Sequence, residues 1–100
     1  MHFVVIAYDQ TDDTAAERRI AVREAHLEGA KKFFASGQWI YAVGILDDDS
    51  KAIGSVIVCD FESREELDDL WLKHEPYITG EVWGKVDVNP AFVPPFCLPQ

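Results

Sequence analysis

Hydrophobic and polar positions follow a helical period over one long segment, from Thr14 to Gly37. Thr14 with Glu17 forms a capping-box pattern, and Gly37 is a typical residue just beyond a helix end. Apolar residues recur on one face at helical spacing: Ile20, Leu27, Ala30 and Phe34. Arg23 falls near the middle of this stripe and His26 on its edge. Because an unpaired buried charge is costly, the pair predicts either a satisfied structural cluster or the wall of a pocket.

The remaining pattern predicts four strands and one shorter helix. Apolar runs at 2–8, 39–46 and 53–61 have the composition of strands, and the last two form a hairpin. A second capping box, Ser63 with Glu66, opens a helix that Pro76 ends. The predicted apolar face of this helix is Leu67, Leu70, Trp71 and His74. Residues 81–89 alternate as a half-buried strand, with Val82, Val86 and Val88 on one side and Trp83, Lys85 and Asp87 on the other.

This order predicts an α+β fold of the ferredoxin-like βαββαβ type, spanning residues 1–100 as a single domain. Four antiparallel strands form one sheet, and both helices cover one of its faces. The first three strands are too apolar for the other face to be solvated, so two sheets are expected to pack face to face in a homodimer. The proline-rich tail, residues 90–100, is expected to wrap over the domain or over a partner subunit.

Composition and charge argue against several classes of binding partner, location and cofactor. A net charge of −9 with no basic run argues against a nucleic-acid or membrane partner. No segment is apolar enough to span a membrane and no signal peptide precedes the first strand, so a cytoplasmic location is expected. Cys59 and Cys97 match no metal pattern, and no disulfide is expected between them. The acidic run 47–49 lacks calcium-loop spacing, and His74 and Glu75 point apart on a helix, so no metal and no other cofactor is expected.

An ordered set of residues resembles the YciI-like protein family along nearly the whole chain. It comprises Arg23, Ala25, His26 and Leu27, then Gly37, Gly44, Gly54, Phe61, Ser63, the turn Glu75–Pro76–Tyr77, Gly80, Val88 and Pro95–Phe96. The resemblance implies a dimeric α+β barrel with a cavity between helix and sheet. It also implies a His–Asp pair proposed for acid–base chemistry. One related activity is a dehydrochlorinase of chlorinated aromatic breakdown, and muconolactone isomerases share the fold.

Residue by residue, the resemblance assigns the family histidine to His26 and the family aspartate to Glu75. Glutamate is one methylene longer, so the geometry of the pair must differ. A second departure is Ile45, where the family often has proline. The implied roles are acid–base catalysis by His26, oriented by Glu75. Arg23 and Tyr77 would bind an anionic or phenolic substrate.

Two functions are compatible with these residues. The first is a cofactor-free enzyme that isomerises its substrate or eliminates a group from it, such as chloride. The second is a non-catalytic dimeric module that binds a small ligand or serves as an accessory partner. Structural roles also stay open at this point: Arg23 can pair with Glu75, Tyr77 can serve packing alone, and His26 can be a hydrogen-bonded core residue.

Overall fold

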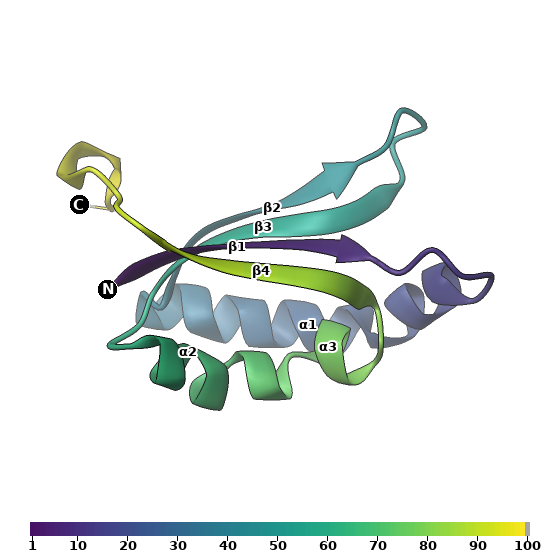
Figure 1. Ribbon diagram of the computed structural model, residues 1–100, viewed down its shortest axis with the longest axis horizontal. Coiled ribbons are helices and arrows are strands. Elements are labelled where there is room, and N and C mark those ends of the chain that lie inside the picture. The colour runs from purple at the N-terminus through teal and green to yellow at the C-terminus, as the bar shows by residue number, and fades with distance from the viewer. Residues whose placement is uncertain (100) are drawn as a thin grey trace.

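The computed structural model describes residues 1–99 and has one antiparallel sheet with helices beneath it (Figure 1). The strands lie in the order β2-β3-β1-β4. Their bounds are β1 (His2–Asp9), β2 (Trp39–Leu46), β3 (Ala52–Asp60) and β4 (Trp83–Ala91). The helices are α1 (Ala15–Ser36), α2 (Arg64–Leu70), η1 (Leu72–His74), α3 (Pro76–Thr79) and, in the tail, η2 (Pro95–Cys97). The predicted ferredoxin-like arrangement is therefore confirmed.

The ends of α1 were predicted to within one residue, but the capping at its start was not. Gly37 ends the helix in the left-handed conformation, with φ 84°, and its N–H donates to the carbonyl of Phe34. Thr14 makes no side-chain cap. Its hydroxyl instead contacts Asp12 and Arg18 at 3.2 Å and 2.6 Å. The predicted capping box is wrong because the ion pair between Arg18 and Asp12 engages the hydroxyl.

Three of the four residues of the apolar stripe predicted for α1 face away from the core, and only Ala30 packs against it. Ile20, Leu27 and Phe34 are 75%, 40% and 63% exposed, and Arg23 between them is also exposed. The helix packs through a different stripe with the same period: Ala15, Arg19, Val22, His26, Ala30 and Phe33. The charged residue on the packed face is therefore Arg19, while His26 is 8% exposed and lies at its centre.

The second helix is divided where a single helix was expected. Ser63 accepts from the Glu66 N–H at 3.1 Å, but the Glu66 carboxylate accepts from the N–H of Glu62, so half of the capping box forms. Helix α2 ends at Leu70, and Trp71 leaves the helical conformation at φ −122°, ψ −71°. Pro76 then begins α3 because proline suits the first turn of a helix. Of the predicted apolar face, Leu67 and Trp71 are buried, while Leu70 and His74 are exposed.

An irregularity in β4 reverses the predicted side of Trp83. Tyr8 pairs with Lys85, but Asp9 pairs with Trp83, so Gly84 is an extra residue in the ladder. This bulge places Trp83 on the buried side, at 4% exposed, where simple alternation placed it with Lys85. The strand also continues through Pro90, which pairs with Phe3 and is tolerated because β4 is an edge strand. The tail therefore begins after Ala91.

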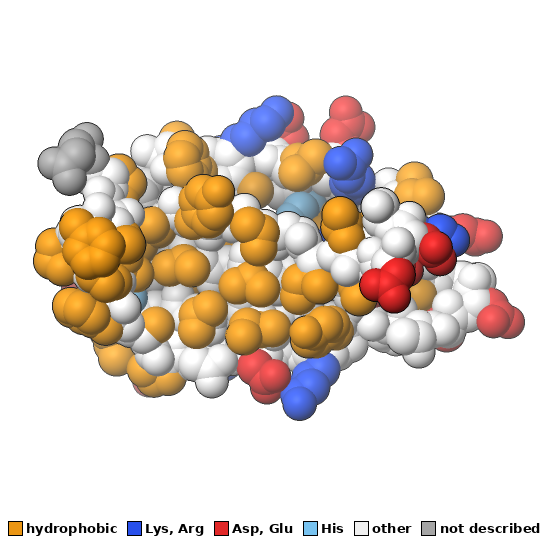
Figure 2. Space-filling model, turned by 90° about the horizontal axis from the view of Figure 1, so that it is seen from above, with side chains coloured by type: hydrophobic (Ala, Val, Ile, Leu, Met, Phe, Trp, Pro, Cys, Tyr) orange, Lys and Arg blue, Asp and Glu red, His pale blue; other side chains and the backbone are white. Residues whose placement is uncertain are grey.

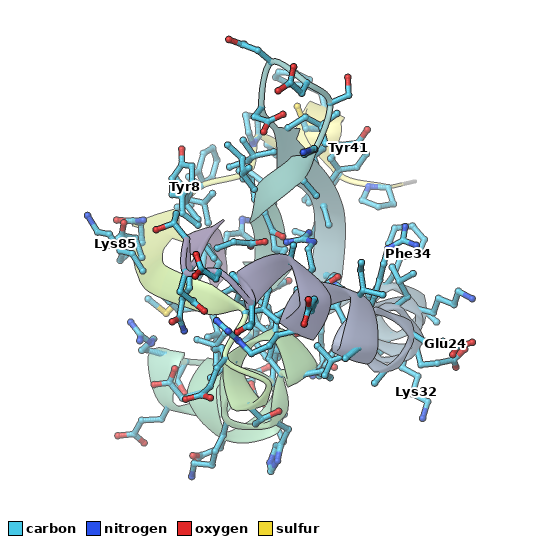
Figure 3. The ribbon with its side chains drawn as sticks, turned by 90° about the vertical axis from the view of Figure 1, so that its right-hand side faces the viewer. Tyr8, Glu24, Lys32, Phe34, Tyr41 and Lys85 are labelled. Carbon is cyan, nitrogen blue, oxygen red and sulfur yellow. The ribbon has the colours of Figure 1, made fainter. Side chains whose placement is uncertain are left out.

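The two faces of the sheet have different environments. The inner face packs against the helices and includes Phe3, Val5, Ile57 and Cys59, each no more than 2% exposed. None of α1, α2 and α3 lies over the outer face, and the tail with η2 stands at one end of it (Figure 1). Apolar side chains gather along it in Figure 2, and Tyr8 and Tyr41 stand on the side opposite the helices in Figure 3. The outward-facing apolar residues of the three more apolar strands include Val4, Ile6, Tyr8, Tyr41, Val43, Ile45, Val56 and Val58.

Candidate active site between the long helix and the sheet

A chamber of about 360 Å³ lies between α1 and the inner face of the sheet. The strand register explains why it is hollow. One row across three strands reads Trp39, Cys59 and Phe3, which are mostly large, whereas another reads Gly44, Ser55 and Ala7. The small residues leave space over one end of the sheet, and this end opens towards α1. The chamber therefore results from the pairing of strands that are distant in sequence.

His26 and Glu75 meet at the wall of this chamber. His26 comes from the packed face of α1, and Glu75 precedes the short helix α3. The Nδ1 atom of His26 is in hydrogen-bond contact with Oε1 of Glu75, and both side chains are buried. A carboxylate can only accept, so with Glu75 ionised the Nδ1 atom carries the hydrogen. The Nε2 atom is then the nitrogen with a free lone pair.

Glu75 is held by two further donors. The Trp71 indole Nε1–H donates to Oε2 at 2.7 Å, and the backbone N–H of Tyr77 donates to Oε1 at 3.1 Å. The second bond also caps the start of α3. Trp71 was expected only to pack, and its polar role was missed because apolar periodicity does not distinguish an indole carbon from an indole N–H. The carboxylate is thus fixed from three directions.

Tyr77 lies between the imidazole of His26 and the guanidinium of Arg19. Its ring stacks on His26 with 3.8 Å between centroids and 11° between planes, and the Arg19 guanidinium carbon lies 4.7 Å from its centroid. Arg19 is itself held by Asp9 at 2.6 Å and 2.7 Å. Burial raises the pKa of Tyr77, opposed by the positive charges of Arg19 and Arg23 and reinforced by the negative charges of Asp9 and Glu75.

Arg23 stands at the mouth of the chamber. A second hollow of about 640 Å³ lies between the start of α1 and the β2–β3 hairpin, and both hollows are lined by Arg19, Arg23 and Ala52. They form one cleft with an outer and an inner part. Across residues 1–99, Arg23 makes no ion pair, so the possible bridge to Glu75 does not form. Lys51 from the hairpin lines the same outer part.

The structure therefore brings three of the four predicted site residues into direct contact, namely His26, Glu75 and Tyr77. Arg23 borders the same chamber from an exposed position. Three lining or supporting residues were not predicted: Arg19, Ser55 and Trp71. Within the described part of the chain, no three His, Cys, Asp or Glu side chains gather as metal ligands do, and no helix is long and apolar enough to cross a membrane.

Comparison with known proteins defines first the fold and then the family. The structure of the 5-chloro-2-hydroxyhydroquinone dehydrochlorinase TftG from Burkholderia phenoliruptrix AC1100, in complex with 2,5-dihydroxybenzoquinone, superposes with a TM-score of 0.78. The two chains are 20% identical, and the match covers 92% of this chain and 94% of TftG, which shows a shared fold. The sequence profile of the YCII-related domain matches residues 1–91, so the chain belongs to the YCII-related family.

Two curated relatives agree with this assignment. An uncharacterised protein of Haemophilus influenzae is 30% identical over 96 residues, which cover 90% of this chain and 95% of that protein. Protein YciI of Escherichia coli O6:H1 has the same identity and coverage. The family resemblance identified in the sequence is thereby confirmed. The roles of the site residues, the dimer and the cytoplasmic location stay predictions.

Proposed function

We propose that this protein is a small enzyme that needs no cofactor and uses His26 as a general acid and base, oriented by Glu75. The substrate class is a small anionic or phenolic metabolite, and the reaction is an isomerisation or an elimination such as dehydrochlorination. The observation that carries this proposal is the buried contact between His26 Nδ1 and the Glu75 carboxylate beside an open chamber. A histidine with one nitrogen fixed and the other free matches an oriented general base.

The mechanism follows from the two ring nitrogens. Nε2 of His26 takes a proton from the substrate, and the positive charge that forms on the ring is stabilised by Glu75 through Nδ1. The bonds from Trp71 and the Tyr77 backbone keep the carboxylate from turning away. His26 then returns the proton to another atom of the substrate, or leaves it on the ring while a leaving group departs. The longer side chain of glutamate is accommodated because it also caps α3.

Substrate binding is assigned to Arg23 and Tyr77. Arg23 lies at the junction of the inner and outer parts of the cleft, where a guanidinium attracts an anionic group. The hydroxyl of Tyr77, a residue of the chamber lining, donates to an oxygen that becomes negative during the reaction. A volume of about 360 Å³ suits a single-ring compound. The ligand in the TftG complex is a single-ring compound of this kind, which supports the size class.

The same proposal includes a homodimer that packs through the outer faces of the two sheets. Val43 and Tyr41 are 47% and 67% exposed on that face, and Tyr8 on β1 is 48% exposed. A continuous apolar surface of this kind is rarely left in water. The dimer would leave the cleft beneath each sheet free for substrate.

The test uses a matched pair of variants, His26→Gln and Glu75→Gln. Chloride release from 5-chloro-2-hydroxyhydroquinone is measured first, followed by deuterium incorporation into small cyclic keto acids in D₂O. We expect His26→Gln to lower turnover by about 100-fold or more, because general base catalysis contributes on that order. Glu75→Gln should lower kcat more than it changes KM. Turnover that survives His26→Gln would exclude the acid–base role, and binding without any turnover would favour the non-catalytic module.

A further inference from the structure

Ser55 is a buried polar residue that the mechanism above does not use. It lies on the inner face of β3, is 6% exposed and lines the chamber. Buried side-chain hydroxyls nearly always have a hydrogen-bond partner. In the part of the chain that the structure describes, the Ser55 hydroxyl has none among its side-chain hydrogen bonds, unlike Ser36 and Ser63, whose hydroxyls are both engaged. Because Ser55 lines the chamber, a molecule bound there can supply a partner for its hydroxyl.

The neighbours of Ser55 explain why no protein group reaches it. Its cross-strand partners are Ala7 on β1 and Gly44 on β2, which carry no polar side-chain atoms. Both are also the smallest residues of their strands' inner faces, so the space beside the hydroxyl stays open. The sheet side of the chamber is otherwise apolar near it, with Ile57 next on the same face. Ser55 is thus a polar side chain of the sheet wall, together with Trp39, whose indole Nε1–H has no partner within residues 1–99, and His26 belongs to the facing helix wall.

We propose that the Ser55 hydroxyl binds an oxygen of the substrate on the carbon next to the one that His26 deprotonates. This inference rests on the proposed function and names its substrate class: a small ring compound with a carbonyl group beside an acidic C–H bond. The C–H bond breaks and its proton goes to Nε2 of His26. The C–H electron pair forms a C=C bond, and the carbonyl π electrons move to the oxygen. Ser55 donates to that oxyanion from the wall opposite the base.

The geometry makes this arrangement specific to the substrate oxygen. A substrate held between the two walls presents one face to His26 and the other to Ser55, so the same ring can lose a proton and have its oxygen bound. An analogue without the oxygen would leave the hydroxyl unpaired in an apolar site. Sites built around such a group discriminate strongly against analogues that lack it.

The experiment compares two probes that differ by one oxygen, 3-oxocyclohexanecarboxylate and cyclohexanecarboxylate. Dissociation constants come from ¹H–¹⁵N chemical-shift titrations, and exchange of the α protons of the keto acid in D₂O is followed by ¹H NMR. The variants are Ser55→Ala, Ser55→Thr and His26→Gln. Gly44→Val serves as a filled-chamber control, because a Cβ at Gly44 meets nothing closer than the Gly54 carbonyl oxygen at 3.9 Å. Circular dichroism checks that each variant folds.

For the wild type we expect the keto acid to bind about five- to tenfold more tightly than its analogue, as one hydrogen bond supplies. Ser55→Ala should abolish this preference and slow exchange, Ser55→Thr should restore it in part, and Gly44→Val should weaken both probes. His26→Gln should abolish exchange and keep the preference. A preference unchanged in Ser55→Ala overturns the Ser55 assignment alone. A Ser55-dependent preference with no exchange in the wild type supports the assignment and removes the proposed catalysis.

Discussion

The two faces of this sheet each depart from the usual relation between polarity and burial, the inner face only beside its chamber and the outer face along its apolar surface. An antiparallel sheet with helices on one side normally buries apolar residues there and presents polar ones to water. Here the helix-covered side contains His26, Ser55 and Glu75, which are 8%, 6% and 3% exposed. The uncovered side presents valines, isoleucines and tyrosines from three strands (Figure 2). Polar groups are buried at a chamber, and apolar groups are exposed where no helix covers them.

The difference between the two faces fits two separate roles for one sheet. Buried polar groups are unfavourable unless they are paired; Glu75 is paired with His26 and Trp71, and Ser55 faces the chamber. Exposed apolar groups are unfavourable unless they are covered, and a second copy of the chain has the same self-complementary surface. Under the proposed function, the inner face binds the ligand and the outer face forms the dimer. Five experiments test this division.

The largest effect is expected from a charge on the outer face. Tyr41→Asp removes little packing within the protomer, since Tyr41 is 67% exposed, but it would place a carboxylate in the apolar dimer interface. We expect association to weaken by roughly 100-fold or more, because burying an unpaired charge costs about 3 kcal/mol or more. Sedimentation velocity over a concentration series measures this. Ile20→Asp, at a position 75% exposed on α1, is the matched control and should leave association unchanged. An equal effect of both would show that the outer face is not the interface.

Substitutions at two glycines test how tightly each face of the sheet is packed. A Cβ at Gly54, whose outer side is covered by Ile45 and Tyr8, would lie 2.5 Å from the backbone oxygen of Ala7, whereas a Cβ at Gly44 on the inner face has open space. Gly54→Ala should therefore reduce the free energy of unfolding by about 2–3 kcal/mol. Gly44→Ala should change it by less than about 1 kcal/mol. Urea denaturation of both variants measures the difference, and similar values would mean that the chamber is not open at Gly44.

Substitutions at two tryptophans test how the buried Glu75 carboxylate is stabilised. Trp71→Phe removes the N–H that donates to Glu75, and the unpaired carboxylate oxygen should cost about 2 kcal/mol beyond the change in packing. Trp83→Phe is the control, because Trp83 is buried but its Nε1–H has no partner within residues 1–99. The loss for Trp71→Phe should exceed that for Trp83→Phe when both are unfolded in urea. Equal losses would reduce Trp71 to a packing residue.

The smallest effect concerns the two thiols. Cys59 on the inner face is 0% exposed, and burial raises its pKa to about 12, assisted by the negative charge of Asp60. Cys97 in the tail is exposed. Ellman's reagent at pH 8 should therefore label one thiol of the native protein, and none in Cys97→Ser. Labelling of Cys59 at the native rate of Cys97 would show that the inner face opens readily.

The same thiol predicts a pH dependence of stability. The unfolded thiol ionises near pH 9, while the folded thiol stays protonated up to about pH 12. Above pH 9 the unfolded state binds fewer protons, so stability falls as the pH rises. The loss attributable to Cys59 should be about 1 kcal/mol at pH 10. It is measured as the difference between the wild type and Cys59→Ala in urea denaturation at pH 8 and pH 10.

Local signals explain which parts of the fold were predictable. The end of α1 at Gly37, the start of α2 at Ser63 and the bounds of β2 depend on neighbouring residues and were read correctly. The packed side of α1 was not, because Ile20, Leu27 and Phe34 are more apolar than the residues that pack. An apolar helix face that stays exposed in the protomer has the same residue periodicity as a face that packs in the core. The side of Trp83 was missed because a one-residue bulge changes the alternation.

The site was predictable only for the residues that the family resemblance identifies. His26 and Glu75 were identified through the family resemblance, and the structure places them in contact. Trp71 was missed because its N–H is indistinguishable from packing until the acceptor is located. Ser55 was missed because its importance depends on the strand register that places Ala7 and Gly44 beside it. Contacts between distant strands leave no local pattern.

The capping bond of Glu75 has a consequence for how this position tolerates change. The same carboxylate oxygen that contacts His26 accepts the Tyr77 N–H that begins α3. A substitution at position 75 therefore alters the chemistry and the local folding together. In a deep mutational scan, abundance and activity scores should fall in parallel at position 75, while at position 26 a polar substitution of similar size, such as glutamine, should lower activity more than abundance. Evolution of a new reaction on this scaffold would accordingly have more freedom at the histidine than at its carboxylate partner.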